Sequence, residues 1–151
     1  TLFPYTTLFR SPTNPVRLIV AAALIAADGR VLLQKRPEGK AMAGLWEFPG
    51  GKVEPGEEPR DALQRELREE LALEAEIGPQ IDAYEFQYPG APSVTALVFF
   101  QVTEFAGEPQ NLDFAQIVWD TPAALPGYDF LEGDVEFVQR LATEQGRQPS
   151  H

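Results

Sequence analysis

The stretch from residue 50 to residue 73 constrains the fold of this chain more than any other part of it. It reads GGKVEPGEE and then PRDALQRELREELAL. The glycines and prolines of the first part are typical of a loop, and Pro59 suits the first position of a helix. Leu63, Leu67 and Leu71 recur at helical spacing and form an apolar face. We therefore predict a loop followed by a helix over residues 59–71, with its leucines packed on a core.

Three carboxylates lie on the same predicted helix. Glu66, Glu69 and Glu70 stand at positions i, i+3 and i+4, which places them on one face beside the leucines. Like charges so close together repel one another. The cluster is favourable when a hard cation neutralises it, and Mg²⁺ takes oxygen ligands while keeping positions for water and phosphate oxygens. A charge run of this kind is more often a solvated helix face when it stands alone, so the choice between that face and a metal site depends on the residues around it.

The carboxylates belong to a longer pattern. From Gly51 the sequence spells G-x5-E-x7-R-E-L-x-E-E, in which Glu57 precedes the helix and Arg65 can hold a carboxylate in place. Residue frequencies give such a match about once in 10⁷ starting positions. The pattern resembles the Nudix box, and the run AGLWEFPGGKVE over residues 43–54 is similar to the MutT-like branch of the Nudix hydrolases and its CTP pyrophosphohydrolase relatives. The resemblance spans residues 16–142.

The resemblance implies a reaction and a set of ligands. It implies Mg²⁺-dependent hydrolysis of a nucleoside triphosphate to a monophosphate and pyrophosphate, with Mn²⁺ as a substitute ion. Catalysis is expected from Glu66, Glu69, Arg65 and Glu57. The implied metal ligands are Gly50, Gly51, Glu66, Glu69, Glu70 and Asp113.

Four further residues are candidates for substrate binding by resemblance. Arg36 and Lys52 are expected to meet the substrate, and Phe99 to stack on a base together with Tyr84 and Phe86, although aromatic residues in strands are more often core. Asp134 matches the position that reads the base edge, with Asp129 as its rival and helix capping as its alternative role.

Asp134 leads to a hypothesis about the base. Oxidation of guanine at C8 turns N7 from an acceptor into a donor, and a carboxyl group can detect that change. We therefore expect oxidised dGTP as the substrate, in nucleotide-pool sanitation. The alternatives are a (d)CTP pyrophosphohydrolase and a non-catalytic Nudix-fold nucleotide-binding module.

One residue departs from the box. Ala72 stands where the family has glycine, whose left-handed conformation ends the helix. Either Ala72 adopts that conformation, at a cost of about 1 kcal/mol, or the helix continues by a turn.

The remaining sequence predicts a single α+β domain over residues 15–145, an αβα sandwich with a mixed sheet. Strands are expected at 16–26, 31–36, 45–48, 81–88, 94–102 and 117–119, with a hairpin turn at Asp28-Gly29. A helical turn is expected at 122–125 and a C-terminal helix at 135–143. Residues 1–11, TLFPYTTLFRS, resemble a translated sequencing-adapter fragment, so residues 1–14 are expected to be non-native or disordered. Residues 146–151 are expected to form a flexible tail.

Composition limits the partners. The net charge is −11, which argues against stable nucleic-acid binding because that needs lysine and arginine. There are no cysteines, which excludes thiol chemistry and fits a reducing cytoplasm. No apolar run is long enough for a membrane span. We expect a cytoplasmic monomer or weak homodimer with a nucleoside triphosphate substrate.

Overall fold

The computed structural model describes residues 16–147. The prediction for residues 1–14 and most of the predicted tail lie outside this range. The strands are β1 (Val16–Leu24), β2 (Val31–Lys35), β3 (Trp46–Glu47), β4 (Gly50–Lys52), β5 (Glu74–Glu76), β6 (Gln80–Phe86), β7 (Val94–Val102), β8 (Glu104–Ala106) and β9 (Gln116–Asp120). The helices are α2 (Pro59–Leu71), the 3₁₀ turns η1 (Pro122–Gly127) and η2 (Glu132–Asp134), and α3 (Val135–Arg147).

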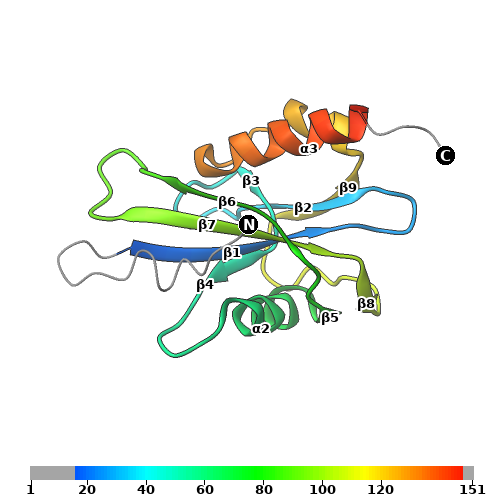
Figure 1. The fold of residues 1–151 in the computed structure, drawn as a ribbon, viewed down its shortest axis with the longest axis horizontal. Helices are drawn as coiled ribbons and strands as arrows, with labels where there is room; N and C mark the ends of the chain where they lie inside the picture. The colour runs from blue at the N-terminus through cyan, green and yellow to red at the C-terminus, as the bar shows by residue number, and fades with distance from the viewer. Residues whose placement is uncertain (1–15, 148–151) are drawn as a thin grey trace.

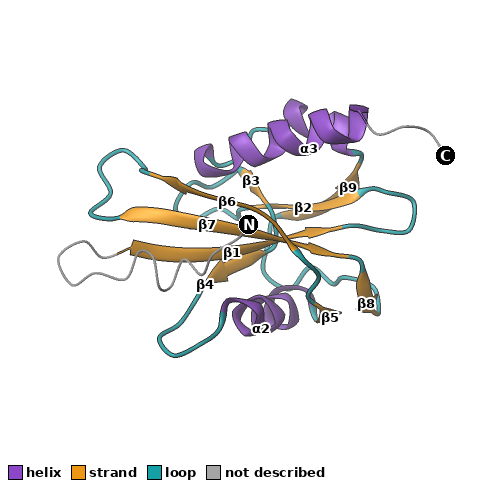
Figure 2. Ribbon diagram, viewed as in Figure 1, coloured by secondary structure: helices purple, strands orange, loops and turns teal. Residues whose placement is uncertain are grey.

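The strands form a mixed sheet system between two helices. One sheet has the order β4-β1-β7-β6, in which β1 and β7 run parallel while β4 and β6 are antiparallel to their neighbours. A second sheet has the order β3-β2-β9, and β5 pairs with β8. Figure 1 shows α3 on one side of the strands and α2 on the other, and Figure 2 shows the same layers by secondary structure. The predicted α+β sandwich is confirmed.

The alternation of side chains along β1 and β7 creates two cores. Val20, Ala22 and Leu24 face α2, and they pack with the leucines of that helix. Ala21 and Ala23 face the opposite side, and they pack with the aromatic side chains near α3. Successive residues of a strand point to opposite faces, so one pair of apolar strands supports both helices.

Helix α2 begins and ends at the predicted residues. Its buried side chains include Leu63, Leu67 and Leu71. Ala72 terminates it in the left-handed conformation, with φ 54° and ψ 38°. Its N–H donates to the Arg68 carbonyl at 3.0 Å, and the Leu73 N–H donates to the Leu67 carbonyl at 3.3 Å. The bond from Ala72 to Arg68 is the 5→1 bond of an αL cap, so the alternative of a longer helix is wrong.

Several short elements differ from the sequence prediction. The turn at Asp28-Gly29 is present, but β1 and β2 share only the bridge between Ile25 and Val31, because each strand enters a different sheet. Strand β4 occupies part of the predicted loop, and β5 and β8 were not predicted. Helix α3 extends to Arg147, beyond the predicted end at residue 143 and into the predicted tail. Within residues 16–147, no helix is long and apolar enough to span a membrane.

Candidate active site

A cleft of about 380 Å³ opens beside the carboxylate face of α2. Its walls come from β1, β4, the loop that follows β2, the loop before β9, and η2. Segments that lie far apart in the sequence therefore meet at one place. Glu66 and Glu70 line this cleft together with Gly50 and Gly51.

The glycines are required by the close approach of β4 to its neighbours. A Cβ atom at Gly51 would lie 2.3 Å from Oε2 of Glu66, so any larger residue would displace that carboxylate. A Cβ atom at Gly50 would lie 2.0 Å from the Val20 carbonyl oxygen, and Gly50 has φ 153°. Only glycine has the freedom and the small volume that these positions need. The backbone of β4 thus lies directly against the carboxylates.

Glu70 is the most perturbed acid of the helix. Its Oε1 accepts hydrogen bonds from the Gly50 N–H and from Nε2 of Gln34, each at 3.3 Å. Burial, followed by the nearby charge of Glu66, raises its pKa to about 8. Burial also raises the pKa of Glu66. Both side chains are therefore poor sites for a bare negative charge, and a cation beside them would reverse that penalty.

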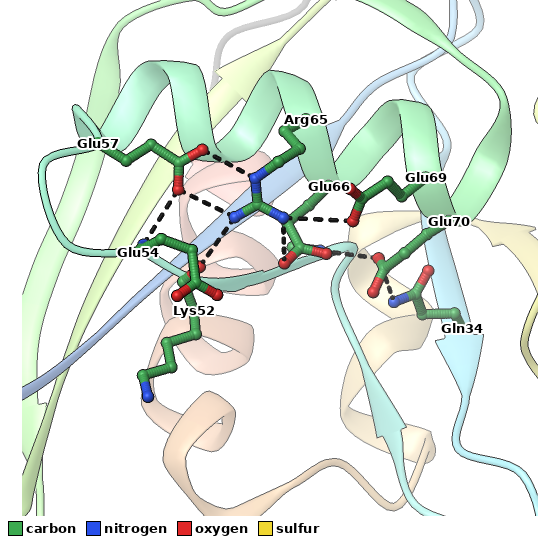
Figure 3. Close-up of polar contacts among 9 residues, drawn as sticks. Gln34, Lys52, Glu54, Glu57, Arg65, Glu66, Glu69 and Glu70 are labelled. Atoms are coloured by element: carbon green, nitrogen blue, oxygen red, sulfur yellow. Dashed lines mark hydrogen bonds and ion pairs between the residues drawn. The ribbon is translucent and has the colours of Figure 1, made fainter.

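Arg65 donates hydrogen bonds to three carboxylates (Figure 3). Its guanidinium donates to Glu57 at 2.8 and 3.0 Å, to Glu66 at 3.3 Å and to Glu69 at 3.2 Å. Nη2 also donates to the Lys52 carbonyl oxygen at 3.2 Å. The hydrogen bonds from Arg65 lower the pKa of Glu57 to about 2. Arg65 thus holds Glu57, which precedes the helix, against the carboxylate face of α2.

Glu69 lies differently from its two partners. Its side chain is 59% exposed, and it is bound by Arg65 at the rim (Figure 3) rather than among the residues that line the cleft. Among the described residues, no three acidic or histidine side chains converge as a ready-made cation site. The donor set nevertheless fits Mg²⁺, because it consists of carboxylate oxygens against a glycine backbone. Glu66 and Glu70 are the two carboxylates of this set that line the cleft.

The predicted substrate residues divide into two groups. Arg36, Lys52 and Asp134 line the cleft, and so does Asp113, which was predicted as a metal ligand. Phe99 does not, because it is fully buried and stacks on Phe137 with ring centroids 3.9 Å apart.

Tyr84 and Phe86 also pack against this core instead of lining the cleft. All three aromatic residues therefore pack in the core near α3. Phe99 does so because it points to the α3 side of β7. Asp129, the rival of Asp134, is also absent from the lining.

Asp134 is a buried acid on the wall of the cleft. Its residue is 6% exposed, and burial, with a contribution from the charge of Glu47, raises its pKa to about 8. The backbone amide of Phe48, a residue of the cleft wall, acts in the opposite direction and lowers the pKa of Asp134. This placement favours a role in the cleft over helix capping.

Two of the polar residues that the sequence analysis missed bind the predicted site residues directly. Glu47 lines the cleft and pairs with Arg36 at 2.8 Å. Gln34 is fully buried, and its Nε2 donates to both Glu47 at 3.0 Å and Glu70 at 3.3 Å. A polar residue in the apolar run VLLQK, and a glutamate between Trp46 and Phe48, were the available signals.

Comparison with known proteins decides the family. The family model for the NUDIX domain matches residues 15–141. The chain belongs to the Nudix family. The loop–helix described above is thus the Nudix box, and the protein is a Nudix hydrolase.

Relatives of this Nudix protein carry two substrate names. It is 37% identical over 131 residues to the CTP pyrophosphohydrolase of Escherichia coli K12, which covers 87% of this chain and 96% of the relative. It is 35% identical over 126 residues to the 8-oxo-dGTP diphosphatase of Haemophilus influenzae, which covers 83% and 91%.

Solved structures agree with this Nudix fold. The solution structure of the Escherichia coli ORF135 protein superposes with a TM-score of 0.79 at 34% identity, covering 94% of this chain and 99% of that chain. A MutT structure from a study of Aliivibrio salmonicida and Vibrio cholerae gives 0.70 at 32% identity, covering 86% and 99%.

Proposed function

We propose that this Nudix hydrolase cleaves a nucleoside triphosphate to a monophosphate and pyrophosphate, with oxidised dGTP as its preferred substrate. The observation that carries the proposal is the shared cleft. Acidic residues of the Nudix box and a buried, readily protonated Asp134 line the same space of about 380 Å³. A cleft of this size suits a small ligand. It thus combines a site for phosphate chemistry with a group able to recognise a base.

In this proposal Glu66, Glu69 and Glu70 would hold Mg²⁺, or Mn²⁺ in its place, with Asp113 and the backbone of Gly50 and Gly51 as further oxygen donors. The bound ion supplies charge neutralisation at the phosphates and lowers the pKa of a bound water. Arg36 and Lys52 line the cleft and bring the positive charge that phosphate oxygens need.

The carboxylates that could orient or deprotonate the attacking water are Glu66 and Glu69. Glu66 lines the cleft, whereas Glu69 lies at its rim in contact with Arg65. We therefore assign the water to Glu66. Attack on the β-phosphorus breaks its bond to the bridging oxygen, which leaves with the nucleoside monophosphate, and pyrophosphate is released.

The base preference is argued from Asp134. With its pKa raised to about 8, this group carries a proton at neutral pH. A neutral carboxyl group donates one hydrogen bond and accepts another. Guanine oxidised at C8 presents O6 as an acceptor and N7–H as a donor, which matches this pair. Unmodified guanine presents two acceptors at the same edge, so one of them stays unpaired at a cost of about 1–3 kcal/mol.

A cytidine triphosphate is the second candidate. Cytosine presents N3 as an acceptor beside the N4 amino donor, and this edge also matches a neutral carboxyl group. The similarity to the CTP pyrophosphohydrolase of Escherichia coli favours the same reading. Either activity would serve the nucleotide pool of the cytoplasm, and neither needs nucleic-acid binding or more than a monomer or weak homodimer.

The test is a screen of canonical and oxidised (d)NTPs with Mg²⁺, in which pyrophosphate release gives kcat/KM for each substrate. We expect oxidised dGTP to exceed dGTP, and Asp134→Ala to lower kcat/KM and reduce that preference together. Faster hydrolysis of CTP or dCTP by the wild type would establish the cytidine reading instead. Nucleotide binding without pyrophosphate release would indicate a non-catalytic module.

A further inference from the structure

Asp134 is the last residue of the 3₁₀ turn η2 and stands directly before α3, so by sequence it occupies the position from which an aspartate can cap that helix. The first amides of a helix have no carbonyl partner within it. A side-chain oxygen at the N-cap normally accepts from the second or third of these amides. A residue that does so has its carboxylate turned back onto its own helix and is not available to a ligand.

Here a tyrosine from β6 supplies that oxygen. The N–H of Phe137, the third residue of α3, donates to Oη of Tyr84 at 3.2 Å. The Tyr84 hydroxyl in turn donates to the Gly133 carbonyl at 2.6 Å. Burial raises the pKa of this hydroxyl, so it keeps the proton that it donates. One hydroxyl group thus joins the start of α3 to the residue before Asp134.

Tyr88 holds the other side of the same residue. Its Oη accepts from the Gly133 N–H at 3.2 Å. A Cβ atom at Gly133 would lie 2.4 Å from this oxygen, so the contact requires glycine. The Asp134 N–H donates to the Leu131 carbonyl at 2.9 Å, which completes the turn. The backbone that leads into Asp134 is therefore fixed on both sides of Gly133.

We propose that Tyr84, assisted by Tyr88, is a positioning residue that caps α3 in place of Asp134 and so leaves the Asp134 carboxyl group free to face the substrate cleft. The inference rests on the proposed role of Asp134 as the base-reading residue. It assigns specificity to two hydroxyl groups outside the Nudix box, of which Tyr88 lines the cleft and Tyr84 packs beside α3.

The decisive variant is Tyr84→Phe, which removes one oxygen. The ring keeps its contacts with Phe99, at 5.6 Å between centroids, and with the Arg140 guanidinium, at 5.5 Å. Without the tyrosine oxygen, we expect the carboxylate of Asp134 to turn toward the Phe137 amide. That carboxylate would then accept an N–H bond, which stabilises its charged form.

Two measurements follow the change. Carboxyl ¹³C NMR titration should show the pKa of Asp134 falling from well above its ordinary value to near or below it. The ratio of kcat/KM for oxidised dGTP to that for dGTP should fall by about fivefold, as expected for the loss of one net hydrogen bond. Tyr128→Phe is the matched control. It removes a hydroxyl that donates to Asp120 at 2.6 Å and does not line the cleft, so both readouts should stay at their wild-type values.

The titration decides the proposal even if the enzyme has another substrate. An unchanged Asp134 pKa in folded Tyr84→Phe overturns the positioning role. If Tyr84→Phe does not fold, Tyr88→Phe is judged by the same titration, with a lowered Asp134 pKa expected and an unchanged one refuting the proposal. Equal oxidised-to-unmodified ratios in the wild type and Asp134→Ala would instead defeat the proposed function, whatever the titration shows.

Discussion

The metal-free protein should lose stability as pH rises from about 5 to 8, and Glu70 should be a main cause. The pKa of Glu70 is about 8 in the folded protein, against an ordinary value of 4.5. The folded state therefore holds the proton more tightly than the unfolded state does. The resulting stabilisation is fully present below pH 4.5 and is lost as pH rises through 8. The expected slope is about 1.4 kcal/mol per pH unit, for a total of a few kcal/mol.

Glu70→Gln isolates this effect. The amide oxygen of glutamine can still accept from Gly50 and Gln34, so the substitution removes the titration while keeping the contacts. Urea unfolding in EDTA at several pH values gives the free energy of unfolding of both proteins. The free energy of unfolding should fall more steeply with pH in the wild type than in the variant. Asp134, whose pKa is also about 8, titrates in both proteins, so its contribution cancels in the difference between the two slopes. Equal slopes, or a wild-type stability that rises from pH 5 to 8, would refute the reasoning. Saturating Mg²⁺ should flatten the wild-type curve, because it favours the charged carboxylate.

Two further substitutions separate chemistry from stability. Glu69→Gln should lower Mg²⁺-dependent pyrophosphate release by orders of magnitude while changing the free energy of unfolding of the metal-free protein by no more than about 1 kcal/mol, because the side chain is exposed and an exposed ion pair such as that with Arg65 contributes little. Full activity would argue against its role as a metal ligand. Ala72→Gly should raise the free energy of unfolding by about 1 kcal/mol, or 2–4 °C in Tm, because it relieves a φ of 54°. Ala142→Gly, inside α3, should lower it by about the same amount, and equal signs for the two alanines would contradict the strain.

Local chemical signals predicted the elements that support the site. Proline at residue 59 and the leucine spacing determine α2, because both act within one helix. Strands β4, β5 and β8 were not predicted for the opposite reason. Each has three residues, and β4 is mostly glycine, so only the partner strands of the folded protein define them.

The candidate site shows the same division. The box pattern placed Glu57, Arg65 and Glu66 correctly relative to one another because the contacts lie within one loop and one helix. Phe99 was assigned to the cleft because its sequence neighbours do not reveal which side of β7 it faces. Gln34 was missed because its place in the site depends on a hydrogen bond to Glu70, which lies 36 residues away in the chain.

The division between two cores also explains how one family can serve different bases. The box helix α2 packs in one core, whereas α3, which follows Asp134 in the chain, packs in the other. Strands β1 and β7 contribute to both cores and hold their relative position (Figure 1). If Asp134 reads the base as proposed, changes around η2 can alter that residue while the carboxylates and glycines of the box keep their geometry. Relatives that carry the same domain but are named for cytidine or for oxidised guanine nucleotides are the expected result of this arrangement.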